Sequence, residues 1–268
     1  MQEIKERLRA FYDSRIGLPI PDDGLVLDVG SGDKPSWRAD VLLDRYPDDA
    51  YAGQRSGTGR TRVDRPLFDA DAAAMPFADG VFDYAICSHV LEHVTDPVAV
   101  VGELTRVAKA GYIEVPEAAA AKIIDFPSHL WWCRLDRSTD PPTLVMEAKR
   151  AASFDPEIEA YLRRSELADP VKRLIDSRHH HNVIALRWSG TQPVRTEGRH
   201  DPDFVERTVN AEAHHTRGGE AIVARALTAA LTYRKPRRRT PIAFDDVVRP
   251  DLRRGDGALL EPRIYRFA

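Results

Sequence analysis

An apolar run that leads directly into a glycine turn most constrains the fold of this chain. Residues 25–29 read Leu-Val-Leu-Asp-Val, and they are followed by Gly30, Ser31, Gly32 and Asp33. A continuous run of Val and Leu is typical of a strand buried in a parallel sheet. Gly30 and Gly32 allow a tight turn and a close approach of the backbone to a ligand. Because α/β sheets bind ligands at the carboxyl ends of their strands, this turn is predicted to form the floor of a cofactor pocket.

The turn alone does not identify the cofactor. A dinucleotide-binding turn carries a third glycine where a helix opens, whereas the corresponding residue here is Pro35. Asp28 and Asp33 would repel a pyrophosphate and would suit a cofactor with a cationic amino-acid end. The alternative for this segment is a plain tight turn after a strand.

Four further short apolar segments predict strands. They are residues 41–44, 66–71, 82–88 and 111–116, and a helical pattern over residues 98–109 precedes the last one. Several strands separated by helices or crossovers indicate a parallel sheet that is covered on both faces. An acid at the end of the second strand, Asp44, suits hydrogen bonds to ribose hydroxyls.

Taken in order, these motifs resemble the class I S-adenosylmethionine-dependent methyltransferases over residues 22–117. The Val-Leu-Glu-His-Val segment at residues 90–94 is similar to the methyltransferase type 11 subgroup. The Gly-Ser-Gly-Asp-x-Pro form of the turn is similar to members associated with surface-polysaccharide and sugar modification. The matching motifs are Asp-Val-Gly-Ser-Gly at 28–32, Asp44, Asp-Ala-x-x-Met-Pro-Phe at 71–77, Phe82-Asp83, Leu-Glu-His at 91–93 and Gly-Tyr-Ile-Glu at 111–114.

The resemblance implies an α/β fold with a Rossmann-like, seven-stranded sheet, mostly parallel, with an antiparallel edge hairpin and a C-terminal elaboration. We expect an N-terminal helix or lid over residues 1–20 and a cofactor-binding core over residues 21–150. Residues 151–233 would complete the sheet and recognise the substrate, and residues 234–268 would form a basic linker and tail.

The resemblance also implies S-adenosyl-L-methionine as the cofactor and assigns roles around it. Asp28, Gly30 and Gly32 would line its methionine end together with Ser31 and Asp33. Asp44 would bind the ribose, Asp71 the adenine amino group and the Ala72 N–H the adenine ring. Ser88 would lie near the reactive methyl group. For Asp44 and Asp71 the alternative is a carboxylate that serves a turn or a helix cap.

The chain departs from the family between the glycine turn and Asp44. Only eleven residues separate Gly32 from Asp44, and residues 34–38 leave room for a short turn at most. We therefore expect no ordinary helix N-terminus at this position to hold the carboxylate end of the cofactor.

Composition is that of a soluble enzyme. The chain has 268 residues, a hydrophobic content of 43% and a net charge of −3, so no global charge attracts nucleic acid. No apolar run approaches the ~18–20 residues that cross a bilayer. The N-terminus has an amphipathic pattern and not a secretory signal. Cys87 and Cys133 form no disulfide framework, which favours a reducing cytoplasm.

The later half predicts helices and strands without a family pattern. Helices are expected over residues 118–124, 155–165 and 220–233, and strands over residues 129–135, 144–149 and 181–188. Two of the later strands would supply the edge hairpin. Residues 45–65, rich in Gly and Arg, predict a loop.

Methyl transfer to a hydroxyl needs a base with a pKa near neutral, and histidine fits this best. His89 and His93, four residues apart, would share a helix face after the fourth strand. His129 precedes two tryptophans, Trp131 and Trp132, of which one is expected in the core and the other at a pocket or in solvent. A sugar or an aromatic acceptor could stack on the second tryptophan, and plain core packing is the favoured alternative. Glu92 could orient a histidine or cap the helix. Structural or surface roles are the alternatives for each histidine.

No metal site is predicted. His179, His180 and His181, like His214 and His215, lack the convergence that a metal needs and read as loop. Arg234 to Arg239 form the strongest charge run, either a solvated linker or a site for RNA, an acidic lipid surface or a phosphorylated substrate.

We therefore predict a cytoplasmic S-adenosylmethionine-dependent methyltransferase that acts on a small-molecule or sugar-linked acceptor, with oxygen as the methylated atom. The alternatives are a non-catalytic module that binds the cofactor or docks a partner, and a nucleic-acid methyltransferase. We expect no membrane span, and we consider a homodimer as one state of the protein.

Overall fold

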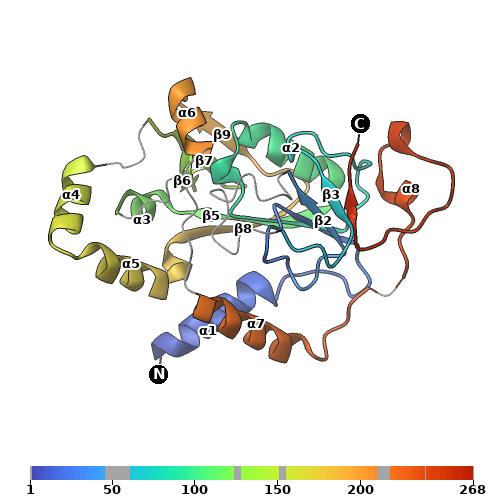
Figure 1. Ribbon diagram of the computed structural model, residues 1–268, viewed down its shortest axis with the longest axis horizontal. Helices are drawn as coiled ribbons and strands as arrows, with labels where there is room; N and C mark the ends of the chain where they lie inside the picture. Colours follow the sequence, from blue (N-terminus) through green and yellow to red (C-terminus); the bar gives the residue numbers. More distant parts are fainter. Residues whose placement is uncertain are drawn as a thin grey trace.

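A central seven-stranded sheet organises the computed structural model (Figure 1). The structure describes residues 2–45, 61–123, 128–150, 155–209, 218–238 and 240–267. The strands run in the order β10-β3-β2-β1-β4-β5-β8. Their bounds are β1 Val26–Val29, β2 Val41–Asp44, β3 Leu67–Asp69, β4 Tyr84–Ser88, β5 Ala110–Pro116, β8 Val183–Ser189 and β10 Ile264–Tyr265.

Strands β1 to β5 are all parallel, as the apolar segments predict. In the register of β1 and β2, Val29 lies opposite Leu43, and in that of β1 and β4 it lies opposite Cys87. Strands β1 and β2 are buried along their whole length because both faces of the sheet are covered. The carboxyl ends of β1, β2 and β4 therefore meet at one edge.

The two outer strands differ from the expectation. The antiparallel edge next to β5 is the single strand β8 and not a hairpin. Side chains of β8 alternate between buried and exposed, as expected where a sheet ends with one covered face. At the other edge β10 pairs with β3 in parallel, so the C-terminal segment joins the sheet.

The expected hairpin exists in a second sheet. Strand β6 (Trp131–Asp136) pairs antiparallel with β7 (Thr143–Ala148), and β7 pairs in parallel with β9 (Val194–Glu197). The expected strands over residues 129–135 and 144–149 are thus confirmed, but they complete a small separate sheet. Leu144 and Met146 of β7 belong to the main hydrophobic core, which fixes the small sheet against it.

Helices cover both faces of the main sheet. Figure 1 shows α1 and α7 on one face and α2 on the other. Helix α2 begins after Asp96, whose side chain accepts the Ala99 N–H at 2.9 Å, and its Val100, Val101 and Leu104 are buried. The helices are α1 Gln2–Arg15, α2 Pro97–Val107, α3 Ala118–Ile123, α4 Pro156–Arg164, α5 Ala168–Ser177, α6 Pro202–Val209, α7 Gly218–Thr232 and α8 Phe244–Val247.

The C-terminal segment contributes to the main core. Phe244 in α8 and Tyr265 in β10 stack on Phe68 of β3, with ring centroids 6.2 and 5.0 Å away. Val247 and Val248 are also buried. The domain boundaries expected from the sequence stay a prediction. Most of the expected loop over residues 45–65, and the His214–His215 pair, lie outside the described residues.

Within the described residues, none of the helices is both long enough and apolar enough to cross a bilayer.

Candidate active site

The turn after β1 is closed by hydrogen bonds to the end of β2. The Gly30 N–H donates to the Leu43 carbonyl at 2.7 Å, and the Gly32 N–H donates to Asp44 Oδ2 at 2.9 Å. Both glycines have positive φ, +68° and +50°. A Cβ at Gly30 would lie 2.3 Å from Cγ2 of Val90, so this position excludes any side chain.

Asp28 lies beneath this turn as a buried carboxyl group. Its Oδ2 accepts the Ser36 N–H at 2.6 Å, and its side chain is 6% exposed. Burial raises the pKa of Asp28 to about 7, while the Ser36 hydrogen bond and the Arg65 charge oppose the rise. A cationic ligand group beside Asp28 would favour its charged form. Residues 31–40 form turns and no helix, which confirms the short connection expected there.

The turn carries a buried polar group without a partner. The Ser31 hydroxyl is buried and has no hydrogen-bond partner within the described part of the chain. A polar ligand is one recognised way to satisfy such a buried group. Together with the buried carboxyl group of Asp28, the Ser31 hydroxyl places a donor or acceptor and a carboxyl group that favours a cation in one place. Asp33 lies in the same turn and is partly exposed.

Asp71 sits in a turn after β3 and is tied to the protein. Its Oδ1 accepts the Ala73 N–H at 2.9 Å, and its Oδ2 pairs with Arg45 Nη1 at 2.7 Å. It thus acts as a turn carboxylate, the alternative considered above, while the neighbouring Ala72 is buried. A role for Asp71 and Ala72 in adenine binding stays a prediction.

The end of β4 carries a linked cluster of polar side chains. The Ser88 hydroxyl donates to Glu114 Oε1 at 3.1 Å, and the Tyr112 hydroxyl donates to Glu114 Oε2. His89 lies between two carboxyl groups, with Nδ1 3.0 Å from Glu92 Oε1 and Nε2 3.3 Å from Glu114 Oε1. Its φ of +56° turns the chain sharply after the strand.

These neighbours determine the protonation state of His89. Burial lowers its pKa, but hydrogen bonds and charges from Glu114 and Glu92 outweigh that effect and raise the pKa to about 10. His89 is therefore an imidazolium at neutral pH, with both N–H groups directed at carboxyl groups. An imidazolium has no lone pair for a proton from an acceptor, so this geometry does not support the expected role of His89 as a base.

The helix expected over His89 and His93 is absent, and this expectation is wrong. Residues Leu91–His93 form a single 3-10 turn, η2, after the left-handed His89. Glu92 and His93 consequently face the start of β6. His93 Nδ1 lies 3.0 Å from the Ser128 carbonyl, and His129 Nε2 lies 3.9 Å from Glu92 Oε1.

Burial keeps His93 and His129 neutral. It lowers the pKa of each to about 4, and in His93 the charge of a protonated His129 would lower it further. Burial would raise the pKa of Glu92, but the His89 contact holds that pKa below its usual range. A carboxylate and two neutral imidazoles thus meet at the end of β4, and their rings and ligand atoms lie within 4.8 Å of one another.

Trp131 and Trp132, which follow His129, are both buried, each 5% exposed. The core-packing alternative is confirmed, and the expectation that one of them lines a pocket or faces solvent is wrong. Trp131 donates its indole N–H to the Val94 carbonyl at 2.7 Å. Trp132 lies under Lys149, whose Nζ is 4.3 Å from the ring centroid. Burial lowers the pKa of Lys149 to about 7.

The other histidine and arginine runs lie apart from this cluster. Residues His179–His181 form a 3-10 turn. In the basic run, the Arg237 guanidinium lies 5.4 Å from the Trp37 ring centroid, and Arg238 donates to the Asp23 carbonyl at 2.8 Å. Among the described residues, this run is therefore packed against the N-terminal part of the chain.

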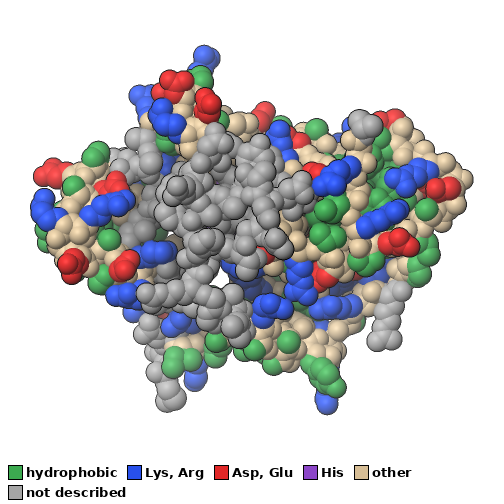
Figure 2. All heavy atoms as spheres, in the orientation of Figure 1, with side chains coloured by type: hydrophobic (Ala, Val, Ile, Leu, Met, Phe, Trp, Pro, Cys, Tyr) green, Lys and Arg blue, Asp and Glu red, His purple; other side chains and the backbone are tan. Residues whose placement is uncertain are grey.

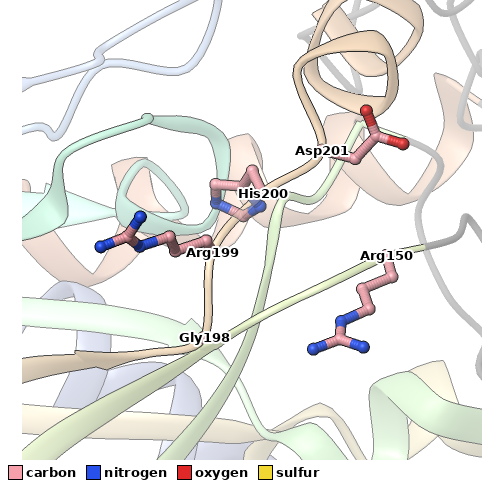
Figure 3. A pocket seen from close by; sticks show the side chains of 5 residues that line it. All are labelled: Arg150, Gly198, Arg199, His200 and Asp201. Atoms are coloured by element: carbon pink, nitrogen blue, oxygen red, sulfur yellow. The ribbon is translucent and has the colours of Figure 1, made fainter.

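An open cavity of about 670 Å³ lies where β7 and β9 end (Figure 3). Arg150, Gly198, Arg199, His200 and Asp201 line it. Figure 3 shows the Arg199 side chain pointing away from Arg150, so the two guanidinium groups do not converge on one anion. None of the residues predicted for the site lines this cavity.

With this geometry in place, the comparisons with known proteins can be set beside it. Residues 27–113 match the methyltransferase domain family. The matched segment runs from β1 through β5 and contains the glycine turn, Asp44, Asp71 and the His89–His93 segment. The matched segment therefore includes both polar clusters, except for Glu114 and His129.

Curated relatives that are named methyltransferases match part of this chain. A demethylmenaquinone methyltransferase of Renibacterium salmoninarum is 38% identical over 88 residues, which cover 32% of this chain and 37% of the relative. Another of a Roseiflexus species is 31% identical over 157 residues, which cover 54% and 61%. The chain thus spans less than two thirds of either relative.

Among solved structures, the YcgJ protein of Bacillus subtilis aligns with 46% of this chain and 61% of its own, at 18% identity and a TM-score of 0.34.

Two carboxyl groups of the site had no assigned role in the sequence-based prediction. Glu92 was considered only as an orienting or capping residue, and Glu114 only as part of a motif. The separation of Glu114 from His89 by 25 residues hides their contact, which the parallel pairing of β4 and β5 creates through Ser88 and Glu114.

Proposed function

We propose that this protein is an S-adenosylmethionine-dependent methyltransferase with a small-molecule acceptor. The observation that carries the proposal is the turn between β1 and β2. There the buried, cation-seeking Asp28, the orphaned Ser31 hydroxyl and Asp44 lie together at the carboxyl ends of adjacent strands. The family match over residues 27–113 supports the same function.

Each group of this turn has a defined task in the proposal. S-adenosylmethionine supplies a methyl group that its sulfonium already activates. Asp28 would balance the ammonium group of its amino-acid end, and Ser31 would hydrogen-bond to that end. Asp44, which orders the turn through the Gly32 N–H, would accept hydrogen bonds from the ribose, since a carboxylate has more than one acceptor site.

The acceptor would lie beyond the end of β4, near Ser88 and the His93–His129 pair. For an oxygen acceptor, we propose that His129 takes the proton, because it is neutral whereas His89 is protonated. A pKa of about 4 makes His129 a weak base. The acceptor hydroxyl should therefore be acidic, as in a phenol, in preference to the alcohol groups of a sugar.

Binding of the cofactor is the first test. Calorimetric titration with S-adenosylmethionine should give saturable binding to the wild-type chain. Asp44→Ala should abolish it, while Asp246→Ala, which removes an exposed carboxylate in α8, should leave it unchanged. Equal affinity in the Asp44 variant would contradict the proposal.

Turnover is the second test. The chain is incubated with methyl-labelled S-adenosylmethionine and a panel of phenols, sugars and demethylmenaquinone. The last compound is included because two partly matching relatives bear its name. Label should appear in a phenolic product.

A cofactor-binding module without catalysis is the second candidate function. It is favoured by the pKa values of the three histidines, none of which lies near neutral. Saturable cofactor binding with no labelled product from the panel or from a cell extract would select this candidate.

A nucleic-acid methyltransferase is less well supported. The Arg237 and Arg238 side chains contact the protein itself, and Figure 2 shows acidic and basic side chains intermixed on the visible faces of α4 and α6.

A further inference from the structure

Three potential metal ligands converge between η2 and the start of β6. Glu92 and His93 come from η2, and His129 precedes β6. One ligand atom from each lies within 4.8 Å of the others. The backbone fixes this meeting, because the Leu130 N–H donates to the Glu92 carbonyl at 2.7 Å.

His93 is held in a tautomer that suits metal binding. Its Nδ1 lies 3.0 Å from the Ser128 carbonyl, which can only accept a hydrogen bond, so Nδ1 carries the proton. The lone pair of the neutral ring is then on Nε2. Metal-ligating histidines commonly donate their second ring N–H to a carbonyl or carboxylate in this way.

Glu92 supplies a buried oxygen that lacks a partner. The residue is 0% exposed, and its Oε1 is in contact with His89. Its Oε2 has no hydrogen-bond partner within the part of the chain that the structure describes. A buried carboxylate oxygen of this kind is costly unless a cation or donor compensates it, and an ion is one recognised explanation.

We propose that Glu92, His93 and His129 bind a divalent transition-metal ion. Two imidazoles and one carboxylate form a ligand set that Zn²⁺ and Fe²⁺ use, with open positions for water or a substrate. The set is poor for Mg²⁺ and Ca²⁺, which prefer oxygen ligands. The proposed ligands are not part of the histidine runs at residues 179–181 and 214–215 that the sequence analysis considered for a metal.

Binding requires the three side chains to move towards one another. In a tetrahedral site, ligands at about 2.0–2.2 Å from the ion lie about 3.3–3.6 Å apart, so the widest separation here, 4.8 Å, must close by about 1.2–1.5 Å. The His129 side chain is 12% exposed and His93 is also partly exposed, so solvent and an ion can reach the trio from their side.

The ion would lie beside the proposed acceptor position. Glu92 connects through His89 to Glu114 and so to the Ser88 hydroxyl at the end of β4. A metal ion lowers the pKa of an oxygen that it binds. It would thus assume the task given above to His129, and this consequence rests on the proposed methyl transfer, whereas metal binding itself does not.

The test uses the untagged full chain, freed of metal with a chelator. Calorimetry with Zn²⁺ and visible absorption with Co²⁺ should both show one bound equivalent. Glu92→Gln and His129→Ala should each weaken Zn²⁺ binding at least tenfold. His181→Ala, which removes an exposed histidine outside the trio, should leave it unchanged.

The site is rejected if Zn²⁺ does not bind, or if both trio variants bind it as the wild type does. Circular dichroism checks the fold of each variant. If Glu92→Gln does not fold, His129→Ala decides, because its side chain reaches the surface. Titration with S-adenosylmethionine on the same samples separates the two proposals, since intact cofactor binding without metal binding removes only the metal site.

Discussion

The two polar clusters at the carboxyl edge of the sheet are built in different ways. The first cluster, around Asp28 and Asp44, lies where the methyl donor is proposed to bind, and we call it the donor-side cluster. It is local, because its hydrogen bonds join residues 8 to 13 positions apart. The second cluster, around His89 and Glu92, lies where the methyl acceptor is proposed to bind, and we call it the acceptor-side cluster. It takes its members from β4, η2, β5 and the segment before β6. The local cluster follows a recognisable motif, whereas the second depends on how distant segments pack.

Gly30 connects the two clusters and should give the largest effect. Gly30→Ala combines a left-handed backbone with a clash against Val90, and should lower the free energy of unfolding by about 4 kcal/mol. Gly190→Ala has a similar φ of +76° with nothing within 4 Å of the added Cβ, and should cost only about 1 kcal/mol. Urea unfolding of both variants measures the difference. Equal losses would show that the clusters are not coupled through Val90.

Loss of His89 should have the next largest effect. His89→Ala leaves the buried Glu92 carboxylate without its cationic partner and should lower the free energy of unfolding by about 2–3 kcal/mol. The exposed His181→Ala should change it by less than about 0.5 kcal/mol. A loss below 1 kcal/mol for His89→Ala would mean that the acceptor-side cluster is not held by this ion pair.

Asp28 should make the donor side sensitive to pH. Its folded-state pKa of about 7 lies above the ordinary value of 3.8, so it binds a proton more tightly when folded. Its contribution to stability is therefore complete below pH 4 and is lost as the pH rises towards 7. Cofactor affinity should change in the opposite sense, falling by up to about tenfold per pH unit below pH 7, because a cationic ligand needs the ionised carboxylate.

Calorimetry with S-adenosylmethionine between pH 5.5 and 8 measures this dependence. Asp28→Asn cannot ionise and should bind weakly at every pH, without the slope. An unchanged slope in Asp28→Asn would assign the pH dependence to another group.

The Arg45–Asp71 pair should give the smallest effect. Its side chains are 58% and 39% exposed, so Arg45→Gln should change the free energy of unfolding by less than about 1 kcal/mol. Urea unfolding of Arg45→Gln and His89→Ala under the same conditions compares their losses in free energy of unfolding directly. A loss above 2 kcal/mol would place a second strongly coupled charge pair on the donor side and remove the contrast between the clusters.

Much of the main sheet was predictable, because β1 to β5 are short apolar runs separated by turns and by the periodic pattern of α2. The turn from Gly30 to Asp44 was also predictable, because its glycines and carboxylates lie close together in the sequence. Strand β10 was not predicted, since two residues carry no periodicity of their own. The partners of β6 and β7 were also beyond prediction, because an alternating pattern identifies a strand but not the sheet to which it belongs.

The amino-acid sequence by itself determined the ordered strands, the glycine turn and the carboxyl groups that mark the donor side, since these depend on neighbours along the chain. Only the tertiary structure decided that His89 lies between two carboxyl groups and that Glu92, His93 and His129 meet. The physical reason is that burial and charge set the protonation of these side chains, and both arise from packing between segments that are distant in sequence.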